Sequence, residues 1–501
     1  MGIFRYFYWH FKTYPKSIIP VQQEQRVPGF DIFALDLNAI FHPVCQKYFF
    51  QTPGKKTFEG CYAEICKEID RLTSHIPPKE ELVLSIDGVA GLSKVNQQRQ
   101  RRYRSVKEKD PELRELFDTN QISVGTEFMI GLRNYIKLYY KDRAVMLLDD
   151  QVGEGEHKII RYLHQKQKKK ICIYSPDADL IMLGIALDKK NVFIFRPNIY
   201  SDIDCSYFLV SIDKFKKDVS QMVDSTQEDR ETQIVTDFVF LLFFLGNDFL
   251  PHSPSYEIKY GGINMILSMY QSVLKDSPGL VMLEKGVYSI RVPLLRKVLE
   301  ELSIREIEMI KLKYKNFRGF PNKLLDQYIR DIDRNFSEYR KAYYQKYFGE
   351  SLDEICREYL NGLCFVGTYY HYGMPDWWYQ YRYDHAPFFT DLYEYVQECK
   401  EDSWYVEFNK NEPLSPLEQL MCVLPHESKN FLPRCIQSFY DEKSELEDLY
   451  PKQFEIDRDG VEQEYEALVM LPRIDPQRIR KAFQKVAHLL SHAEKERNVS
   501  R

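Results

Sequence analysis

The chain has 501 residues, of which 44% are hydrophobic and 29% charged. This composition is typical of folded globular proteins and excludes a disordered or fibrous chain. At about 150 residues per domain, the length predicts roughly two to four domains. The ten cysteines are scattered without a CxxC pair. We therefore expect neither a zinc ribbon nor a disulfide framework, and we favour a reducing intracellular compartment, cytoplasm or nucleus.

Neither the net charge nor the apolar segments indicate binding to nucleic acid or to a membrane. The net charge of −5 alone gives no support to nucleic-acid binding. The longest apolar run, Phe238 to Leu245, is far shorter than the ~20 residues that a membrane span requires. The N-terminus lacks the apolar core of a signal peptide. We expect no membrane association.

The pattern of elements changes along the chain. In the first half we predict strands at 31–35, 82–86, 144–148, 171–174 and 192–195, and helices such as 58–72 and 127–140 between them. This alternation predicts an α/β domain around a largely parallel sheet. The following sequence is helical and highly charged, then aromatic-dense, and it ends in a helix that frays into a polar tail. The expected regions are 1–265 (α/β), 266–360 (charged helical connector), 361–475 (a second, aromatic-rich region) and 476–501 (C-terminal helix and tail).

Seven acidic residues follow predicted strands or the long apolar run 238–245. They are Asp36, Asp87, Glu154, Glu156, Asp177, Asp179 and Asp248. Ligands bind at the carboxyl ends of the strands in open α/β sheets, so we expect these acids to converge at one edge. The i,i+2 spacing of both acidic pairs would place their members on one side of an extended backbone, and Gly153 and Gly155 would permit a tight turn beside them.

Crowded carboxylates repel one another unless a cation neutralises them, and Mg²⁺ prefers carboxylate and water oxygens. Two such ions about 4 Å apart would suit an in-line phosphoryl displacement. The alternative for each acid taken alone is a helix cap or a turn. The whole set favours a metal site.

A basic segment follows Asp87. Residues 94–109 contain seven lysines or arginines and one glutamate. If the segment is helical, one face presents Lys94, Gln98, Arg101 and Arg102. Three cations and an amide suit a terminal phosphate. The alternative is a solvated basic face.

Aromatic residues concentrate in TYYHYGMPDWWYQYRYDHAPFF, residues 368–389, which includes Trp377 and Trp378. Aromatic rings beside Arg382 and histidines suit stacking on unpaired bases. The alternative is a packing segment that docks the second region onto the first.

Taken together, the motifs resemble those of the Xrn-type 5′→3′ exoribonucleases. The resemblance rests on ALDLNAIFHP, SIDGVAGLSKVNQQRQRRYR, GEGEHKI, DADLIMLG, GNDFLPHSPSYEIKYGGI and YYHYGMPDWWYQYRYDHAP. These motifs follow one another in order across nearly the whole chain. The resemblance implies a PIN/FEN-like nuclease fold, with the region 361–475 wrapping it and completing an RNA channel.

The resemblance also implies roles for single residues. The seven acids match the family's catalytic Mg²⁺-binding set, with two ions and Mn²⁺ as an alternative. Lys94, Gln98, Arg101 and Arg102 match its pocket for an RNA 5′-monophosphate. His42 matches a base-stacking histidine, and its partner ring falls among residues 377–379. The implied activity is degradation of single-stranded 5′-monophosphorylated RNA to nucleoside 5′-monophosphates in mRNA degradation or RNA processing, by a compact monomeric member with the two catalytic regions only.

The chain departs from the family pattern at a few positions. Gly91 and Leu92 stand where the family usually has Pro and Arg, Val152 stands where Pro is frequent, and Tyr379 replaces a second Trp. None is an expected metal ligand. The rival hypotheses are a flap-type structure-specific DNA nuclease and a catalytically silent RNA-binding scaffold, and a protein partner for the region 266–360 is a further hypothesis.

Overall fold

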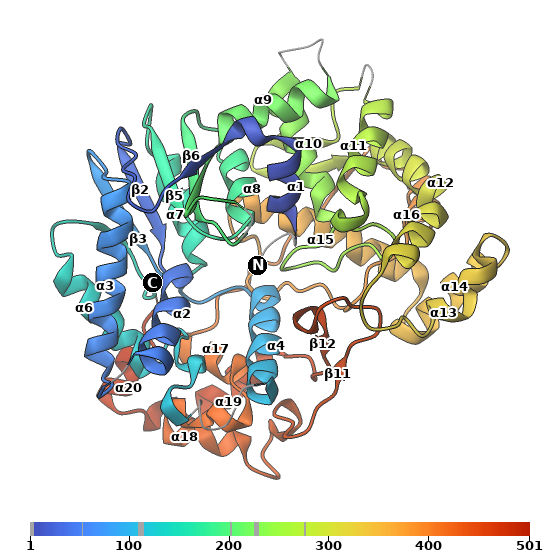
Figure 1. Cartoon of the computed structure of the whole chain (residues 1–501). Coiled ribbons are helices and arrows are strands. Elements are labelled where there is room, and N and C mark those ends of the chain that lie inside the picture. Colours follow the sequence, from blue (N-terminus) through green and yellow to red (C-terminus); the bar gives the residue numbers. More distant parts are fainter. Residues whose placement is uncertain are drawn as a thin grey trace.

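A seven-stranded sheet forms the centre of the computed structural model, which describes residues 5–52, 54–108, 115–200, 203–224, 230–274 and 277–500. The strand order is β1-β7-β6-β5-β2-β3-β4 (Figure 1). The strands are β1 (Ile18–Val21), β2 (Ile32–Asp36), β3 (Glu81–Ser85), β4 (Val145–Leu147), β5 (Ile171–Tyr174), β6 (Val192–Pro197) and β7 (Tyr207–Ser211).

All five predicted strands form, as β2 to β6, and every pair among them is parallel. The expected α/β class with a largely parallel sheet is therefore confirmed. In register, Leu35 lies opposite both Leu84 and Tyr174, so the carboxyl ends of β2, β3 and β5 are level. We did not predict two strands, β1 and β7, at one edge of the sheet. There β7 pairs antiparallel with β6, and β1 pairs antiparallel with β7.

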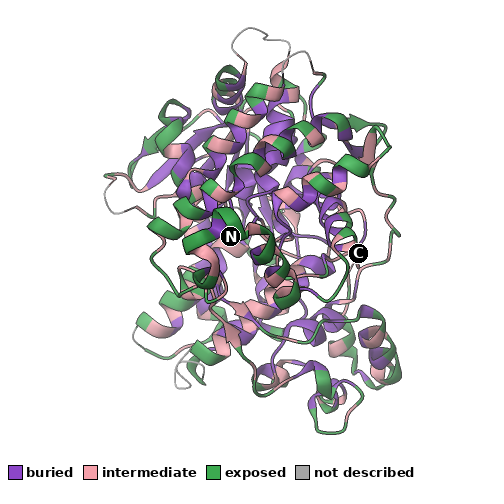
Figure 2. Ribbon diagram, turned by 90° about the vertical axis from the view of Figure 1, so that its right-hand side faces the viewer, coloured by how far each residue is buried: buried purple, intermediate pink, exposed green. Residues whose placement is uncertain are grey.

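Helices cover both faces of the sheet, which explains why its central strands are continuous apolar runs. Alternate residues of β2 contribute to two cores: Ile32 and Ala34 to one, Phe33 and Leu35 to the other. One face packs on α2 (Asn38–Gln46), α3 (Phe58–His75) and α6 (Glu127–Tyr139). The other packs on α1 (Tyr6–Thr13), α7 (Gly155–His164), α8 (Asp179–Ala186), α9 (Ile212–Val223) and α10 (Glu231–Phe243). Figure 2 shows the buried strands between these helices.

A mostly helical part follows in the sequence. Its helices are α11 (Gly262–Val273), α12 (Val292–Asn316), α13 (Leu325–Tyr328), α14 (Ile332–Tyr347), α15 (Leu352–Tyr372) and α16 (Phe389–Glu398). The segment 266–360 also contains a hairpin that we did not predict, made of β8 (Val281–Glu284) and β9 (Val287–Arg291), and β10 (Ser403–Tyr405) pairs with β9. Positive φ angles at Lys285 and Gly286 suit its two-residue turn.

The C-terminal segments pack around helix α4 (Leu92–Glu108), which lies apart from the sheet (Figure 1). They are α17 (Pro416–Val423), α18 (Arg434–Gln437), α19 (Pro476–Val486) and a short pair, β11 (Ile456–Asp457) with β12 (Leu468–Val469). The last helix, α20 (His492–Arg497), instead contacts the loop before α6 through Arg497. No helix within the described ranges combines the length and apolar character that crossing a bilayer requires.

The expectation of a fraying polar tail is wrong. Helix α20 begins with a capping box between Ser491 and Glu494. Arg497 is buried, and its Nε donates a hydrogen bond to the carbonyl oxygen of Gly125 (2.8 Å). We missed this helix although its capping box is a local signal, and the partners that hold Arg497 lie beyond any local pattern, 372 residues away at Gly125 and 66 away at Phe431.

Candidate functional site

The predicted acids gather where the parallel strands end. Asp36 ends β2, Asp87 follows β3, Glu154 and Glu156 open α7, Asp177 follows β5, Asp179 begins α8, and Asp248 lies in the loop after α10. A cavity of about 490 Å³ opens at this edge, and five of the acids line it: Asp36, Asp87, Glu154, Glu156 and Asp177. Asp179 and Asp248 do not line it but interact electrostatically with this group.

Burial and mutual repulsion shape the protonation of these carboxyls. Burial, with the negative charges of Asp87 and Asp177, raises the pKa of Asp36. Burial and the nearby Asp248 raise the pKa of Asp179 to about 7. The pKa values of Asp87 and Glu156 are also raised, mainly by burial and in both cases with a contribution from Glu154. Burial is the largest cause of each raised pKa and repulsion between the carboxylates adds to it, so a cation placed among them would favour their charged forms.

Short-range contacts hold the carboxylates in place. The backbone N–H of Gly155 donates to Asp87 Oδ1 at 2.6 Å. A Cβ atom at position 155 would lie 3.2 Å from that oxygen and 3.3 Å from Asp36 Oδ1, so glycine permits this approach. Asn38 joins two strand ends, because its side-chain oxygen accepts from the Asp87 N–H (2.9 Å) and its own N–H donates to Asp36 (3.3 Å).

The expectation that both acidic pairs lie on extended backbone is wrong. Glu154 is extended (φ −68°, ψ 146°), but Glu156 lies in the first turn of α7 and Asp179 in the first turn of α8. The acids converge because the chain turns into a helix at each pair, and helix N-termini favour negative charge. The predicted tight turn is present, with Gly153 at φ +101°.

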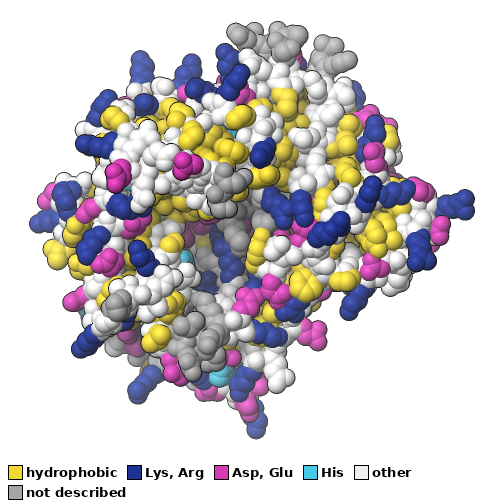
Figure 3. Space-filling model, viewed as in Figure 1, with side chains coloured by type: hydrophobic (Ala, Val, Ile, Leu, Met, Phe, Trp, Pro, Cys, Tyr) yellow, Lys and Arg dark blue, Asp and Glu magenta, His cyan; other side chains and the backbone are white. Residues whose placement is uncertain are grey.

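Helix α4 faces the acids across the cavity. The four residues predicted to bind phosphate, Lys94, Gln98, Arg101 and Arg102, all line the same cavity. Figure 3 shows this face of the molecule hollowed near its middle, with Lys and Arg side chains inside the hollow. The predicted helix and its polar face are therefore present.

Lys94 contacts the acids directly. Its Nζ lies 2.6 Å from Glu154 Oε2 and 2.7 Å from Asp248 Oδ2. Burial alone would raise the pKa values of Glu154 and Asp248, but the Lys94 ammonium lowers both. Arg101 lies farther away, 3.8 Å from Asp248 Oδ1, and Arg102 donates to Ser123 Oγ at 2.6 Å. Lys94 thus neutralises part of the acidic edge.

The acid set fits a hard divalent cation by its chemistry, because all of its donors are carboxylate oxygens that repel one another. Within the described ranges, however, no three Asp, Glu, His or Cys side chains stand ready to ligate one ion. Lys94 is the cation that Glu154 and Asp248 hold in this arrangement.

Of the residues predicted to stack on bases, one lines the cavity and two do not. His42, exposed on α2, lines the cavity. Trp377 and Trp378 do not belong to its lining: the Trp377 carbonyl accepts from the Leu92 N–H (2.8 Å), and the Trp378 ring lies 5.0 Å from the Arg480 guanidinium. Tyr379 stacks on Phe365 at 4.4 Å. The stacking role of the two tryptophans stays a prediction.

Residues that we did not predict complete the site. Tyr369, on α15, donates its hydroxyl to Glu154 Oε1 (2.8 Å) and stacks on His157 (3.7 Å). Ser175 Oγ donates to Asp36 (3.5 Å) and accepts from the Asp177 N–H (3.2 Å). Tyr369 is 215 residues from Glu154. No local sequence signal connects the two.

The structure shows what surrounds Gly91, the position where the family usually has Pro. A Cβ atom there would lie 2.7 Å from the Cε atom of Met374. The next residue, Leu92, is hydrogen bonded to Trp377. The flexible end of the Met374 side chain occupies the space beside Gly91 and would have to move to admit a larger residue there.

Comparisons with known proteins identify the family. The profile for the XRN 5′-3′ exonuclease N-terminus matches residues 1–198, and the profile for the Xrn1 helical domain matches residues 228–319 and 330–501. Together these matches cover most of the chain. The chain belongs to the XRN 5′-3′ exonuclease family, as its motifs predicted.

Curated relatives are similar over the whole chain at low identity. Human 5′-3′ exoribonuclease 1 is 25% identical over 99% of this chain and 35% of its own length. The *Saccharomyces cerevisiae* 5′-3′ exoribonuclease 1 is 24% identical over 99% of this chain and 44% of its own length. The Arabidopsis thaliana 5′-3′ exoribonuclease 2 is 26% identical over 99% of this chain and 68% of its own length. The chain thus spans less than half the length of the first two relatives.

Among solved structures, flap endonuclease-1 from *Methanococcus jannaschii* matches 60% of this chain and 94% of its own, at 12% identity and a TM-score of 0.32. A likeness at that TM-score carries no argument about fold or function.

Proposed function

We propose that this protein is a 5′→3′ exoribonuclease that degrades single-stranded 5′-monophosphorylated RNA to nucleoside 5′-monophosphates. One observation carries the proposal: buried carboxylates at the strand ends and the polar face of α4 line one cavity of about 490 Å³. Such a cavity offers oxygen ligands on one wall and phosphate-binding donors on the other.

The α4 wall would anchor the 5′-phosphate. Within the described part of the chain, Arg101 Nε and Gln98 Oε1 are buried without a hydrogen-bond partner. An unpaired buried guanidinium donor is costly, and an anion entering the cavity would satisfy it. Arg102, held by Ser123, would add a second guanidinium.

The acidic wall would position the scissile phosphate. Asp36, Asp87, Glu154, Glu156, Asp177, Asp179 and Asp248 would hold two Mg²⁺ ions, or Mn²⁺, whose chemistry is to activate water and to stabilise developing charge. Lys94 bridges the two walls and would share its charge between Glu154, Asp248 and the bound phosphate. His42 would stack on a leading base, worth on the order of 1–3 kcal/mol.

We propose further that residues 361–475 narrow access to the cavity, so that single strands enter and duplexes do not. Tyr369 reaches the acidic wall from this region, and the Trp377 carbonyl contacts the first residue of α4. We place the protein in the cytoplasm or nucleus, with single-stranded RNA as its partner.

The test uses 3′-labelled single-stranded RNA with a 5′-monophosphate or a 5′-triphosphate, in Mg²⁺ and in chelator. We expect Mg²⁺-dependent release of mononucleotides from the monophosphate RNA alone, because a larger 5′ group would not fit the pocket. Equal hydrolysis of both RNAs would contradict the phosphate pocket, and no hydrolysis of either would favour an RNA-binding scaffold. Degradation of single-stranded DNA in preference to RNA would favour the flap-type DNA nuclease.

A further inference from the structure

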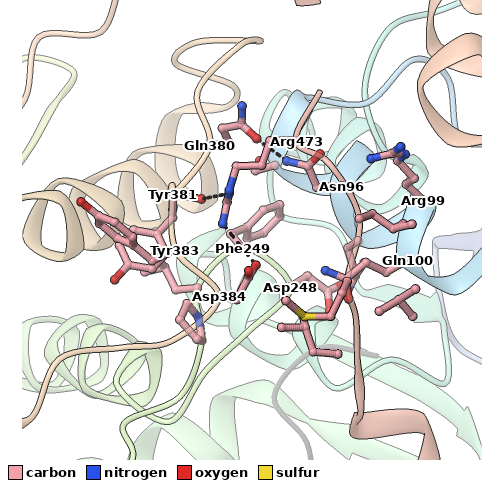
Figure 4. A pocket seen from close by; sticks show the side chains of 18 of the residues that line it. Asn96, Arg99, Gln100, Asp248, Phe249, Gln380, Tyr381, Tyr383, Asp384 and Arg473 are labelled. Atoms are coloured by element: carbon pink, nitrogen blue, oxygen red, sulfur yellow. Dashed lines mark hydrogen bonds and ion pairs between the residues drawn. The ribbon is translucent and has the colours of Figure 1, made fainter. Parts of the chain in front are cut away.

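A second cavity lies on the opposite side of α4 from the acidic edge. It measures about 350 Å³, and its walls come from α4, the loop 247–251, the segment 380–384 and the segment 468–473 (Figure 4). Asp248 stands between the two cavities, because its carboxylate is hydrogen bonded to Lys94, which lines the first, and to Gln97, which lines the second. No residue of the acidic set other than Asp248 lines this second cavity.

Two amide side chains in its wall have orientations that their partners determine. Gln97 Nε2 donates to the Asp248 carboxylate, which only accepts, so Gln97 Oε1 is left over. Asn247 Oδ1 accepts from the N–H groups of Phe249 and Leu250 (2.9 Å each), so Asn247 Nδ2 is left over. Both remaining atoms are buried and have no hydrogen-bond partner among the described residues. The wall thus has one free acceptor and one free donor, each costly to leave unpaired.

The other walls are flat and aromatic, and the rim holds Arg473 beside the acidic side chains of Asp384 and Glu466. Phe249, Tyr381 and Tyr383 line the cavity, and the buried hydroxyl of Tyr383 also has no hydrogen-bond partner in the described part of the chain. At the rim, Arg473 is 3.2 Å from both the Tyr381 carbonyl and Asp384 Oδ1 (Figure 4). The side chains of Arg473 and Asp384 are each 42% exposed. Such an exposed ion pair is weak, so an anionic ligand can compete for Arg473.

We propose that this second cavity binds a nucleoside 5′-monophosphate, with its base against Gln97 and Asn247 and its phosphate at Arg473. A nucleobase edge presents both donors and acceptors, so it can supply a donor to Gln97 Oε1 and an acceptor to Asn247 Nδ2. Its ring faces suit aromatic walls, and the cavity volume lies within the usual range for small-ligand sites, about 300–1,000 Å³. The role of this ligand as the product of the neighbouring cavity rests on the proposed function, whereas its binding does not.

Photolabelling tests the site without hydrolysis. The full-length protein, in chelator, is illuminated with 8-azidoadenosine 5′-monophosphate, and labelled peptides are mapped by mass spectrometry. We expect saturable labelling of peptides containing residues 380–384 or 468–473 that excess AMP prevents. Labelling confined to the first cavity, or labelling that does not saturate, would overturn the proposal. Because the experiment contains no RNA and no free metal, a failure of the proposed exonuclease activity would leave its result unchanged.

Variants separate the two cavities. L468W fills the second cavity and should reduce labelling of its peptides at least tenfold, while R102A, at a residue that lines only the first cavity, should leave that labelling intact. Y383F removes one unpaired hydroxyl with little change of shape and should raise the half-saturating concentration about two- to tenfold. The matched control Y405F alters an exposed tyrosine on β10 and should have no effect. Unchanged labelling in folded L468W, or equal behaviour of Y383F and Y405F, would contradict the site.

Discussion

The acidic edge of the sheet and helix α4 line one cavity, but different parts of the chain hold them in place. The acids are held largely from within the α/β part of the chain, by residues such as Asn38 at the start of α2, Gly155 at the start of α7 and Ser175 after β5. Helix α4 is held by distant C-terminal segments: Arg99 donates to the carbonyls of Leu449 and Pro472, and Arg104 donates to those of Tyr465 and Ala467. Leu92 and Val95 share a core with α17 and α19.

This difference suggests a division of labour. If the acids perform hydrolysis and α4 recognises the RNA end, damage to one wall should leave the function of the other measurable. The following variants test that separation.

The largest effect is expected from D177A on the acidic wall. Loss of a metal-binding carboxylate should slow RNA hydrolysis at least about 100-fold, because metal ions supply several kcal/mol of transition-state stabilisation. Binding of 5′-monophosphate RNA, measured by filter binding, should persist because α4 is untouched. The control D142N alters an exposed aspartate at φ +59°, a conformation that Asn tolerates, and should keep full activity. Undiminished hydrolysis by D177A would remove Asp177 from the metal site.

On the opposite wall, R101A should reduce end selectivity. Hydrogen bonds to a charged group are worth about 1.5–3 kcal/mol, so the ratio of rates on 5′-monophosphate and 5′-hydroxyl RNA should fall about ten- to 100-fold. Hydrolysis of the 5′-hydroxyl RNA should change little. K107A removes a cation from the exposed end of the same helix and should preserve the ratio. An unchanged ratio in R101A would contradict the phosphate pocket.

The attachment of α4 can be weakened without touching the first, acidic cavity. R99M keeps most of the apolar stem but takes the guanidinium donors away from the buried carbonyl of Leu449 and from the carbonyl of Pro472, an exposed residue. We expect a loss of about 2–3 kcal/mol in the free energy of unfolding, measured by urea denaturation. R357M removes a side chain that is 50% exposed and forms its ion pair within α15. It should lower the free energy of unfolding by at most about 1 kcal/mol. Equal stabilities of the two variants would argue against the C-terminal support of α4.

The smallest expected effect is on the pH dependence of stability, through Asp149 in the turn that leads to Glu154. Burial raises the pKa of Asp149 to about 6, despite Arg133 at 3.5 Å. The folded state then binds the proton more tightly than the unfolded state, so this group makes stability fall as pH rises from about 4 to 6. D149N should remove that decrease, on the order of 1–3 kcal/mol, in urea denaturation at the two pH values. D150N, a neighbouring and more exposed aspartate, should retain it. The same pH dependence in D149N and the unaltered protein would refute the assignment.

Much of the sheet and of the site could be predicted, because the signals are local. Apolar runs identified β2 to β6, and acids after four of them, β2 to β5, marked the edge where they meet. Helical spacing placed Lys94, Gln98, Arg101 and Arg102 on one face of α4, and all four line the cavity. The i,i+2 argument for the acidic pairs was wrong, since it assumed extended backbone where α7 and α8 begin.

The sequence by itself determined the family, the parallel sheet and the identity of the residues at its carboxyl edge, because strand ends and helical faces depend on neighbours within a few residues. Only the tertiary structure decided that Lys94 pairs with Glu154 and Asp248, that Tyr369 reaches Glu154, and that a second cavity lies behind α4. These contacts join residues that are 60 to 215 positions apart. They depend on which buried surfaces pack together, and no short-range pattern encodes that.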